Sequence, residues 1–331
     1  MSSESFAGLP HLICMKRITG IHHVTAIAGD PQRNLDFYGG ILGLRLVTLT
    51  VNFDDPGTYH LYYGNYSGDP GTILTFFPWR GIPKGRVGAG QISTTSFSVP
   101  KGGLQYWLGR LAEHAIPVRG PERRFAEEVL TFDDFDGMHV ELVASDVIDP
   151  RAAWDGGPVP AEAAIRGLYS ATLAVPRFAA SERLLTGIMG FRKTGEEAGR
   201  HRYETADGGP HAIVDLIETP ASQRGMQGAG SVHHIAWRVP SDAEQAEWRS
   251  ELVSAGLGVS PVMDRNYFHS IYYREPSGIL FEIATDPPGF AIDEPLADLG
   301  RRLVLPEWLE PRRTELEGVL PALTIPEAQY A

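Results

Sequence analysis

Two short stretches decide how this chain folds: residues 20–29 read GIHHVTAIAG, and residues 230–239 read GSVHHIAWRV. Each places a His-His pair in a run that is otherwise mostly apolar and β-branched, which is typical of a buried strand. A single buried histidine is commonly a packing residue. Two matched pairs in distant parts of the chain instead indicate an internal repeat whose copies share a task.

The repeat has four copies. Each begins with strand-like alternation, continues into an amphipathic helix and closes with further strands. The closing stretches read GTILTFFPW, GMHVELVA, HAIVDLIE and GILFEIAT. In the first copy, helical spacing of Leu35, Tyr38 and Leu42 precedes Gly43 as the expected C-cap, and Ser241 is an expected N-cap in the fourth. The sequence therefore predicts an α+β fold of four β-α-β-β-β modules.

The copies can be aligned on their Val-Pro pairs, which match Ala28-Gly29 of the first copy. The matching positions on the opening strands are then His23, Thr94, Ser170 and His234. The matching positions on the closing strands are Thr75, Glu141, Asp215 and Glu282. Only the first and fourth copies have an opening histidine, and only the last three have a closing acid.

The pairing of modules decides which of these side chains meet. Pairing the first module with the fourth brings together His23, His234 and Glu282, a facial triad with open positions that is the usual ligand set of non-haem Fe(II). Pairing the first with the second offers only His23 and Glu141. Pairing the third with the fourth offers His234, Glu282 and Asp215. We favour the first with the fourth because this pairing uses both His-His pairs.

This plan resembles the vicinal oxygen chelate superfamily of glyoxalases, bleomycin-resistance proteins and extradiol dioxygenases. Three stretches resemble in particular its ring-cleaving dioxygenases that act on para-hydroquinones: GIHHVTAIAGDPQRNLDFY, TYHLYYGNYSGDPGTILTFFPW and DRNYFHSIYYREPSGILFEIATDPPGF. The resemblance implies two tandem vicinal-oxygen-chelate domains of two modules each. The expected divisions are an N-terminal extension (1–17), a first domain (18–145), a linker (146–164), a second domain (165–290) and a C-terminal tail (291–331).

The resemblance also implies the site residues. In that family the second histidine of each pair and a glutamate on the last strand bind iron, which implies His23, His234 and Glu282 here, with Fe(II) as cofactor and Mn(II) left open. The residues that the resemblance places beside the metal and substrate are His22, Thr25, His233, Arg265 and Tyr272. Because neighbouring strand residues point to opposite faces, the roles of His22 and His233 rest on the resemblance and not on periodicity.

The function that the resemblance implies is an Fe(II)-dependent, extradiol-type dioxygenase that inserts O2 into a hydroquinone-like aromatic diol. Two other functions stay open. A glyoxalase-type metal-dependent isomerase or lyase on the same scaffold usually needs a second carboxylate, where this chain has Thr75. A metal-free small-molecule binding module tends to have two modules and no triad.

The amino-acid composition limits which kinds of partner the chain is expected to bind. The formal net charge of −12 argues against binding of nucleic acid or an anionic membrane surface. Cys14 is the single cysteine, so no internal disulfide can form. No apolar run reaches the ~18 residues of a membrane-spanning helix. We expect a cytoplasmic enzyme whose partners are the diol and O2, and the edge strands leave a homodimer open.

Two further ionisable residues are interpreted without a catalytic role. His60, in TYHLYYG, lies on a predicted strand where it could line the pocket, and core packing is the favoured interpretation. Glu141, in HVELVA, occupies a ligand position without a histidine in its module, and is taken as a relic of duplication or a surface acid.

Overall fold

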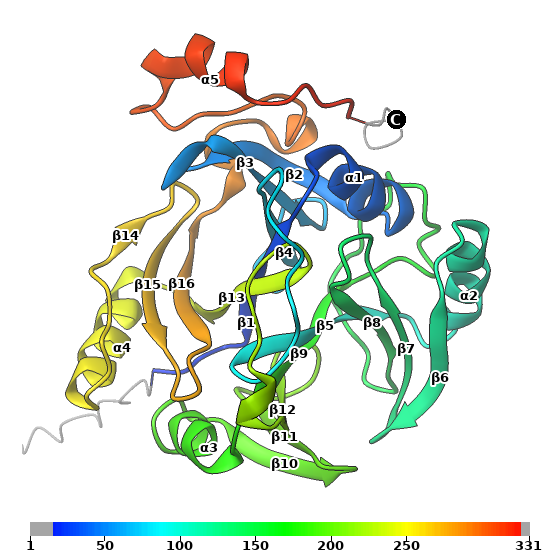
Figure 1. Ribbon diagram of the computed structural model, residues 1–331, viewed down its shortest axis with the longest axis vertical. Coiled ribbons are helices and arrows are strands. Elements are labelled where there is room, and N and C mark those ends of the chain that lie inside the picture. Colours follow the sequence, from blue (N-terminus) through cyan, green and yellow to red (C-terminus); the bar gives the residue numbers. More distant parts are fainter. Residues whose placement is uncertain (1–15, 326–331) are drawn as a thin grey trace, which may run out of the picture.

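Figure 1 shows a computed structural model of the chain, which describes residues 16–325. Residues 1–15 of the predicted N-terminal extension lie outside the described residues. Across the described residues, no helix combines the length and apolar character needed to cross a membrane.

The four predicted modules are present, each in the order β-α-β-β-β. The first contains β1 (Ile21–Ala28), α1 (Pro31–Leu35), the π-helix η1 (Asp36–Ile41), β2 (Arg45–Asn52), β3 (Asp55–Gly64) and β4 (Ile73–Pro78). The second contains β5 (Gln91–Val99), α2 (Leu104–Glu113), β6 (Val118–Arg124), β7 (Glu127–Asp133) and β8 (His139–Ala144). The third contains β9 (Gly167–Val175), α3 (Phe178–Gly187), β10 (Arg192–Glu197), β11 (Arg200–Glu204) and β12 (Ile213–Glu218). The fourth contains β13 (Ser231–Val239), α4 (Asp242–Ser254), β14 (Met263–Asp264), β15 (Phe268–Arg274) and β16 (Leu280–Pro288).

Local signals explain the helix boundaries. Ser241 is the N-cap of α4 and accepts a hydrogen bond from the backbone N–H of Glu244, as predicted. Asp30 caps α1 in the same way. The predicted first helix is a short α-helix that continues as the π-helix η1, and it ends before Gly43, whose φ of +70° favours glycine.

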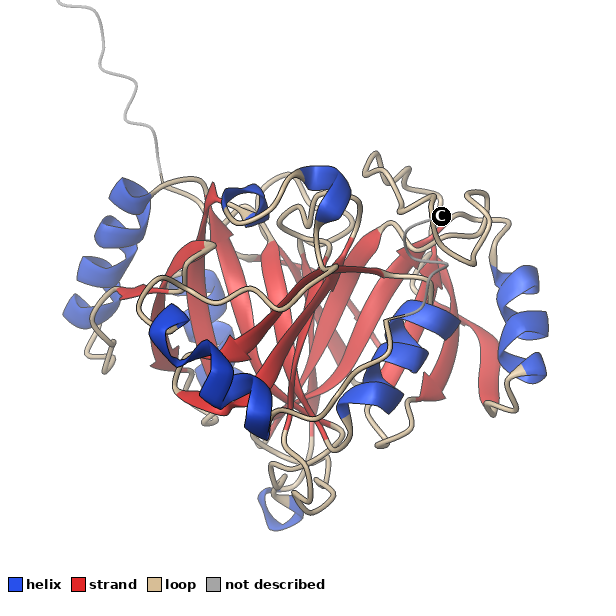
Figure 2. Cartoon of the chain, turned by 90° about the horizontal axis from the view of Figure 1, so that it is seen from above, coloured by secondary structure: helices blue, strands red, loops and turns tan. Residues whose placement is uncertain are grey.

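The strands form two eight-stranded sheets. The first has the order β14-β15-β16-β13-β1-β4-β3-β2, and the second has the order β10-β11-β12-β9-β5-β8-β7-β6. The first module therefore pairs with the fourth, as favoured from the sequence, and the second pairs with the third. In each sheet, the opening strands of the two modules meet antiparallel at the centre, β1 against β13 and β5 against β9. Figure 2 shows strands filling the centre of the molecule, with most of the helices around them.

The predicted α+β fold of four modules is thus confirmed. Each sheet takes one module from each half of the chain, so a sheet is not the same unit as a sequential pair of modules. The residue boundaries expected for the tandem domains stay a prediction.

Both central strands of the first sheet carry a β-bulge beside a metal-ligand candidate. The register of β1 against β13 shifts at His22 on one strand and at His233 on the other, so each is the extra residue of a bulge. The second sheet repeats both bulges, at Ser93 on β5 and Tyr169 on β9. A bulge interrupts strict alternation and re-aims the neighbouring side chains. Two adjacent histidines can therefore lie against each other and serve one site.

Connecting segments hold the modules in place. The segments after β4 and after β12 run side by side, and the backbone N–H of Gly85 donates to the carbonyl of Ala229 at 2.8 Å. After β16, the chain continues through η3 (Phe290–Ile292), η4 (Leu296–Asp298), η5 (Glu310–Arg312) and α5 (Arg313–Val319). Figure 1 shows this tail, coloured orange to red, beside β3 and β2, where the N–H of Val304 donates to the carbonyl of Leu49.

Candidate metal centre and active-site cavity

The three predicted ligands meet at the middle of the first sheet. His23 comes from β1, His234 from the adjacent strand β13, and Glu282 from β16 on its other side. Oε2 of Glu282 lies 2.9 Å from Nε2 of His234 and 3.4 Å from Nε2 of His23, and the two Nε2 atoms are 3.3 Å apart. All three side chains are buried. The side chains of the predicted triad therefore lie close together in the structure.

These distances suit a cation. Three ligand atoms that lie ~2.1 Å from a metal at right angles to one another are ~3 Å apart. Oε1 of Glu282 accepts a hydrogen bond from Ser270, but its buried Oε2 has no hydrogen-bond partner among residues 16–325. A buried, unpaired carboxylate oxygen is costly unless an ion satisfies it. Of residues 16–325, only this group of three or more His, Cys, Asp or Glu residues has the spacing to hold a metal ion.

The charge state of the cluster also favours a cation. Burial lowers the pKa of His234 below its usual value, so this imidazole is neutral and its Nε2 can offer a lone pair. Burial acts to raise the pKa of Glu282, but the two facing imidazoles outweigh it and hold the pKa well below the usual range. The site is then an ionised carboxylate with imidazole nitrogens, as divalent metal binding requires.

The first histidine of each pair lies within hydrogen-bond distance of the second. Nδ1 of His22 lies 2.9 Å from Nδ1 of His23, and Nδ1 of His233 lies 2.7 Å from Nδ1 of His234. A neutral imidazole that binds metal through Nε2 keeps its proton on Nδ1, where it can donate to the neighbouring Nδ1. The bulges therefore give each ligand a hydrogen-bond acceptor behind it.

Replacing His22 by phenylalanine is expected to weaken metal binding by about 10–100-fold, because His23 would lose the acceptor that orients it. A ring of similar size would still pack against Phe268, which contacts His22 at a centroid distance of 5.0 Å. Competition with a calibrated chelator measures the change. His114→Ala, at an exposed position, is the control, and an unchanged affinity in His22→Phe would remove this role.

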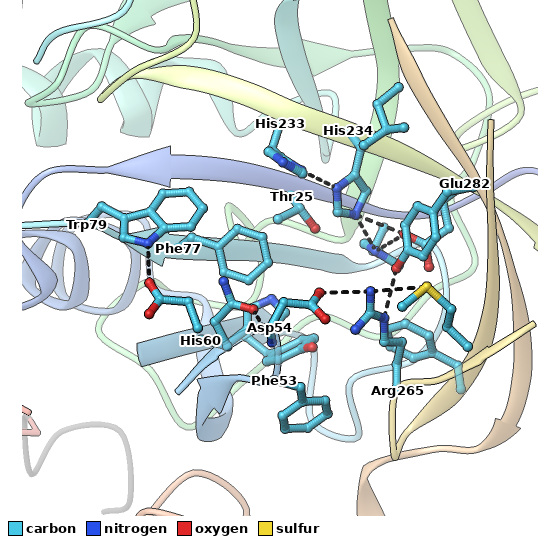
Figure 3. A pocket seen from close by; sticks show the side chains of 18 residues that line it. Thr25, Phe53, Asp54, His60, Phe77, Trp79, His233, His234, Arg265 and Glu282 are labelled. Atoms are coloured by element: carbon cyan, nitrogen blue, oxygen red, sulfur yellow. Dashed lines mark hydrogen bonds and ion pairs between the residues drawn. The ribbon is translucent and has the colours of Figure 1, made fainter. Parts of the chain in front are cut away.

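A cavity of about 530 Å³ opens beside the cluster. Figure 3 shows its lining side chains. Aromatic rings form much of its wall, from Phe53, Tyr62, Phe77, Trp79 and Phe268. Such a mostly apolar pocket with a few converging polar groups suits a small aromatic molecule.

Of the five residues predicted beside the metal and substrate, four line this cavity: Thr25, His233, Arg265 and Tyr272. His22 is buried behind His23 and is not part of the lining. Its position favours the orienting role described above over contact with a substrate.

Arg265 and Tyr272 are hydrogen-bonded to each other on one wall of the cavity. Nε of Arg265 donates to the hydroxyl of Tyr272 at 3.1 Å, and its Nη2 lies 3.1 Å from the carboxylate of Asp54 in the β2–β3 turn (Figure 3). Burial and the charge of Glu282 raise the pKa of Tyr272, so its hydroxyl keeps its proton. Since that oxygen accepts from Arg265, its hydrogen is available to donate to a bound molecule.

His60 takes part in the cavity wall, the alternative that the sequence left open beside core packing. It packs on Tyr62 and Phe77, but it also lines the cavity, and its Nε2 lies 2.9 Å from Oγ1 of Thr75. Thr75 in turn donates to Oγ1 of Thr25 at 2.8 Å. His60 therefore lines the cavity and packs on aromatic rings at the same time. Thr75 could have indicated the polar role of His60 from the sequence, because it is a polar residue at the closing-strand position where the fourth module has its glutamate.

The matching region of the second sheet carries ion pairs in place of a metal cluster. Arg124 donates to both carboxylate oxygens of Glu141 at 2.8 and 2.6 Å. Arg202 bonds to both oxygens of Asp215 and also pairs with Glu127. Glu141 is buried, so its interpretation as a surface acid is wrong. Guanidinium groups neutralise these acids, and threonine and serine stand where the first sheet has histidines.

Comparison with known families agrees with the fold. The model of the Glyoxalase/Bleomycin resistance protein/Dioxygenase superfamily matches residues 20–147 and 167–283. The chain belongs to this superfamily, as the resemblance implied.

Within the superfamily, the chain is similar to proteins with dioxygenase names. It is 50% identical over 307 residues to "Putative ring-cleaving dioxygenase MhqO" of Bacillus subtilis, covering 92% of this chain and 97% of that protein. It is 34% identical to chlorohydroquinone/hydroquinone 1,2-dioxygenase of Sphingobium indicum, over 91% of this chain and 95% of that protein.

Solved structures agree. A crystal structure of a "putative dioxygenase" from Bacillus subtilis has a TM-score of 0.89 and 48% identity, covering 94% of this chain and 99% of that one. Glyoxalase I from Zea mays shares the fold at a TM-score of 0.60 and 14% identity, over 82% of this chain and 92% of that one.

Proposed function

We propose that this chain is a ring-cleaving, extradiol-type dioxygenase that depends on Fe(II) and inserts O2 into a hydroquinone-like aromatic diol. The observation that carries the proposal is the buried triad of His23, His234 and Glu282, with one carboxylate oxygen unsatisfied and an aromatic-walled cavity beside it. The relatives named above support the substrate class.

The ligand set supports iron. Two imidazoles and one carboxylate leave three of six positions open, enough for a diol and O2 together. A bound Fe(II) would supply a path for electron density from the aromatic ring to O2. The same ligand types accept Mn(II), so the choice of iron belongs to the proposal.

His233 is proposed to donate a hydrogen bond into the cavity. Burial lowers its pKa to about 3, so the ring is neutral at pH 7. Its Nδ1 faces Nδ1 of His234, which needs an acceptor when that ligand holds a metal. The single proton of His233 then resides on Nε2, where it can stabilise negative charge on a substrate or oxygen atom.

Arg265 and Tyr272 are proposed to bind the other side of the substrate. The guanidinium stays charged, because the carboxylate of Asp54 and the nearby Tyr272 outweigh its burial and raise its pKa. The Tyr272 hydroxyl can donate while it accepts from Arg265. Together they would hold an anionic oxygen beside the triad, and the aromatic walls would orient the ring.

The isomerase or lyase alternative is less well supported. Proton-transfer chemistry at such a site usually uses a second carboxylate, and the closing position of the first module holds Thr75. That hydroxyl is already engaged with Thr25 and His60.

Oxygen uptake tests the proposal. The protein is loaded anaerobically with Fe(II), Mn(II) or Zn(II), and hydroquinone, its chloro and methyl derivatives, and catechol are added in parallel. We expect O2 consumption that matches loss of the aromatic absorbance, fastest with Fe(II) and a para-diol, and none with redox-inert Zn(II). Absence of uptake with every diol, although Fe(II) is bound, would contradict the proposal.

A cytoplasmic location and a homodimer are further proposals that accompany this function. Cys14 as the single cysteine is compatible with a reducing compartment. Sedimentation at several concentrations would measure the oligomeric state.

A further inference from the structure

The two modules of the first sheet are built on the same plan, and comparing them reveals a feature of the cavity. In the fourth module, Tyr272 on β15 lies opposite Glu282 on β16. In the first module, Tyr62 on β3 lies opposite Thr75 on β4. Thr75 therefore occupies the position that the metal-ligand glutamate occupies in the other module.

The residue two places before each tyrosine repeats the correspondence. Ser270 precedes Tyr272 and donates a hydrogen bond to Glu282. His60 precedes Tyr62 and contacts Thr75 through Nε2 at 2.9 Å. Residues at i and j±2 on neighbouring strands are diagonal neighbours, which explains why both contacts form. A His–Thr pair in the first module therefore stands where the fourth module has a Ser–Glu pair.

The hydrogen-bond directions then follow from counting protons. A threonine hydroxyl has one hydrogen. Thr75 donates it to Oγ1 of Thr25 at 2.8 Å, so the contact with His60 must be donated by the histidine. His60 therefore carries a proton on Nε2. Oγ1 of Thr25 accepts from Thr75, and its own hydrogen has no acceptor among residues 16–325, on a side chain that lines the cavity.

We propose that His60 and Thr75 are positioning residues, which fix the hydroxyl of Thr25 as a hydrogen-bond donor to an oxygen atom of the diol or of O2. The inference rests on the proposed function, because that function supplies the oxygen atoms. We call the hydrogen bonds from His60 to Thr75 and from Thr75 to Thr25 the relay. Without the relay, the Thr25 hydroxyl could rotate and accept a hydrogen bond as readily as donate one. With it, the first module contributes a preorganised donor beside the triad.

The state of His60 supports this arrangement. Burial lowers its pKa well below the usual value, and the nearby metal-ligand histidines and Arg265 lower it further. A neutral imidazole with a proton on Nε2 has none on Nδ1. The ring is also held between Tyr62 and Phe77, at centroid distances of 4.0 and 4.3 Å, so its orientation is fixed by packing.

A first experiment tests the proton position without requiring turnover. Long-range 1H–15N correlation spectra are recorded on the metal-free full chain labelled with 15N-histidine, and His60→Gln identifies the His60 signals. We expect a protonated Nε2 and an unprotonated Nδ1. The opposite tautomer would overturn the inference, whatever reaction the protein catalyses.

A second experiment tests the consequence by a double-mutant cycle in the Fe(II)-loaded protein. Thr25→Val is expected to lower kcat by roughly 10²-fold, as loss of a preorganised donor does, and Thr75→Val by about tenfold. The double variant should be no slower than Thr25→Val, because Thr75 acts only through Thr25. Losses that multiply in the double variant would contradict the relay.

Matched variants separate hydrogen bonding from packing. Thr75→Ser and His60→Gln keep a donor, and we expect both to retain most of the wild-type kcat. Thr75→Val and His60→Phe keep the volume without the donor, and we expect them to lower kcat with little change in KM. Equal rates within each pair would overturn the inference. If the wild-type protein consumed no O2 while His60 showed the Nε2 proton, the proposed reaction would fail and the hydrogen-bond relay would stand.

Discussion

Replacing His234 by alanine is expected to remove both the bound metal and the oxygen uptake. Nε2 of His234 lies 2.9 Å from Oε2 of Glu282, and loss of this imidazole leaves two ligands on the strands to either side of β13. Orienting partners of metal ligands typically contribute 10–100-fold to affinity, so loss of a ligand itself should lower activity by roughly a thousandfold or more. Metal content after dialysis and the rate of O2 uptake measure the two losses.

Two further variants sharpen this test. Glu282→Gln keeps the shape of the side chain and its contact with Ser270 but removes the charge, and we expect the same loss of metal. His114→Ala removes an exposed histidine and should change neither quantity. Full metal content and normal turnover in His234→Ala would show that the triad does not hold the metal.

Replacing Arg202 by alanine is expected to destabilise the protein strongly, by about 3–5 kcal/mol. The buried Arg202 pairs with two buried carboxylates, donating to Asp215 at 2.9 and 3.0 Å and to Oε2 of Glu127 at 3.1 Å. Without it, the contacts that remain among the described residues are Arg200 at 3.2 Å for Asp215 and the hydroxyl of Tyr169 for Glu127. Buried negative charge without a cation is what makes this loss large.

Urea denaturation of the metal-free protein measures the change in the free energy of unfolding. Arg312→Ala is the control, because Arg312 pairs with Glu315 on the surface and should leave the midpoint unchanged. A shift of less than about 1 kcal/mol in Arg202→Ala would mean that the ion pairs of the second sheet contribute little. The triad variants should lose metal but remain folded, whereas Arg202→Ala should lose stability. The first sheet is therefore expected to bind the metal, and the ion pairs of the second sheet are expected to stabilise the fold.

The triad could be predicted from the sequence because the motifs that indicate it are short and occur in more than one module. The two His-His pairs and the Val-Pro register aligned His23 and His234 with Glu282, and the choice among pairings followed from using both pairs. The structure confirms that register, since Thr25 pairs with Thr75 as Ala236 pairs with Glu282.

The bulges could not be predicted from periodicity. A strict period of two residues sends His22 and His233 away from the metal, and only the extra residue on each strand brings them behind the ligands. Glu141 was misjudged for a related reason. Its partner Arg124 lies on a strand two places away in the sheet, and nothing in the sequence around Glu141 indicates that pair.

The hydrogen bond between His60 and Thr75 was not predicted, because it forms across two strands. Thr75 is distant in sequence, and the diagonal relation between β3 and β4 is fixed only when the strands pair. A strand histidine with aromatic neighbours looks like a packing residue until that register is known.

The most direct test of the central claim is the fate of 18O-labelled O2 in a single turnover. Fe(II)-loaded protein is mixed anaerobically with hydroquinone and then exposed to the labelled gas, and the product is reduced at once and analysed by mass spectrometry. We predict a ring-opened product that contains both oxygen atoms of one O2 molecule. A product that keeps the aromatic ring, or one that contains no label, would contradict the assignment of this site to ring cleavage.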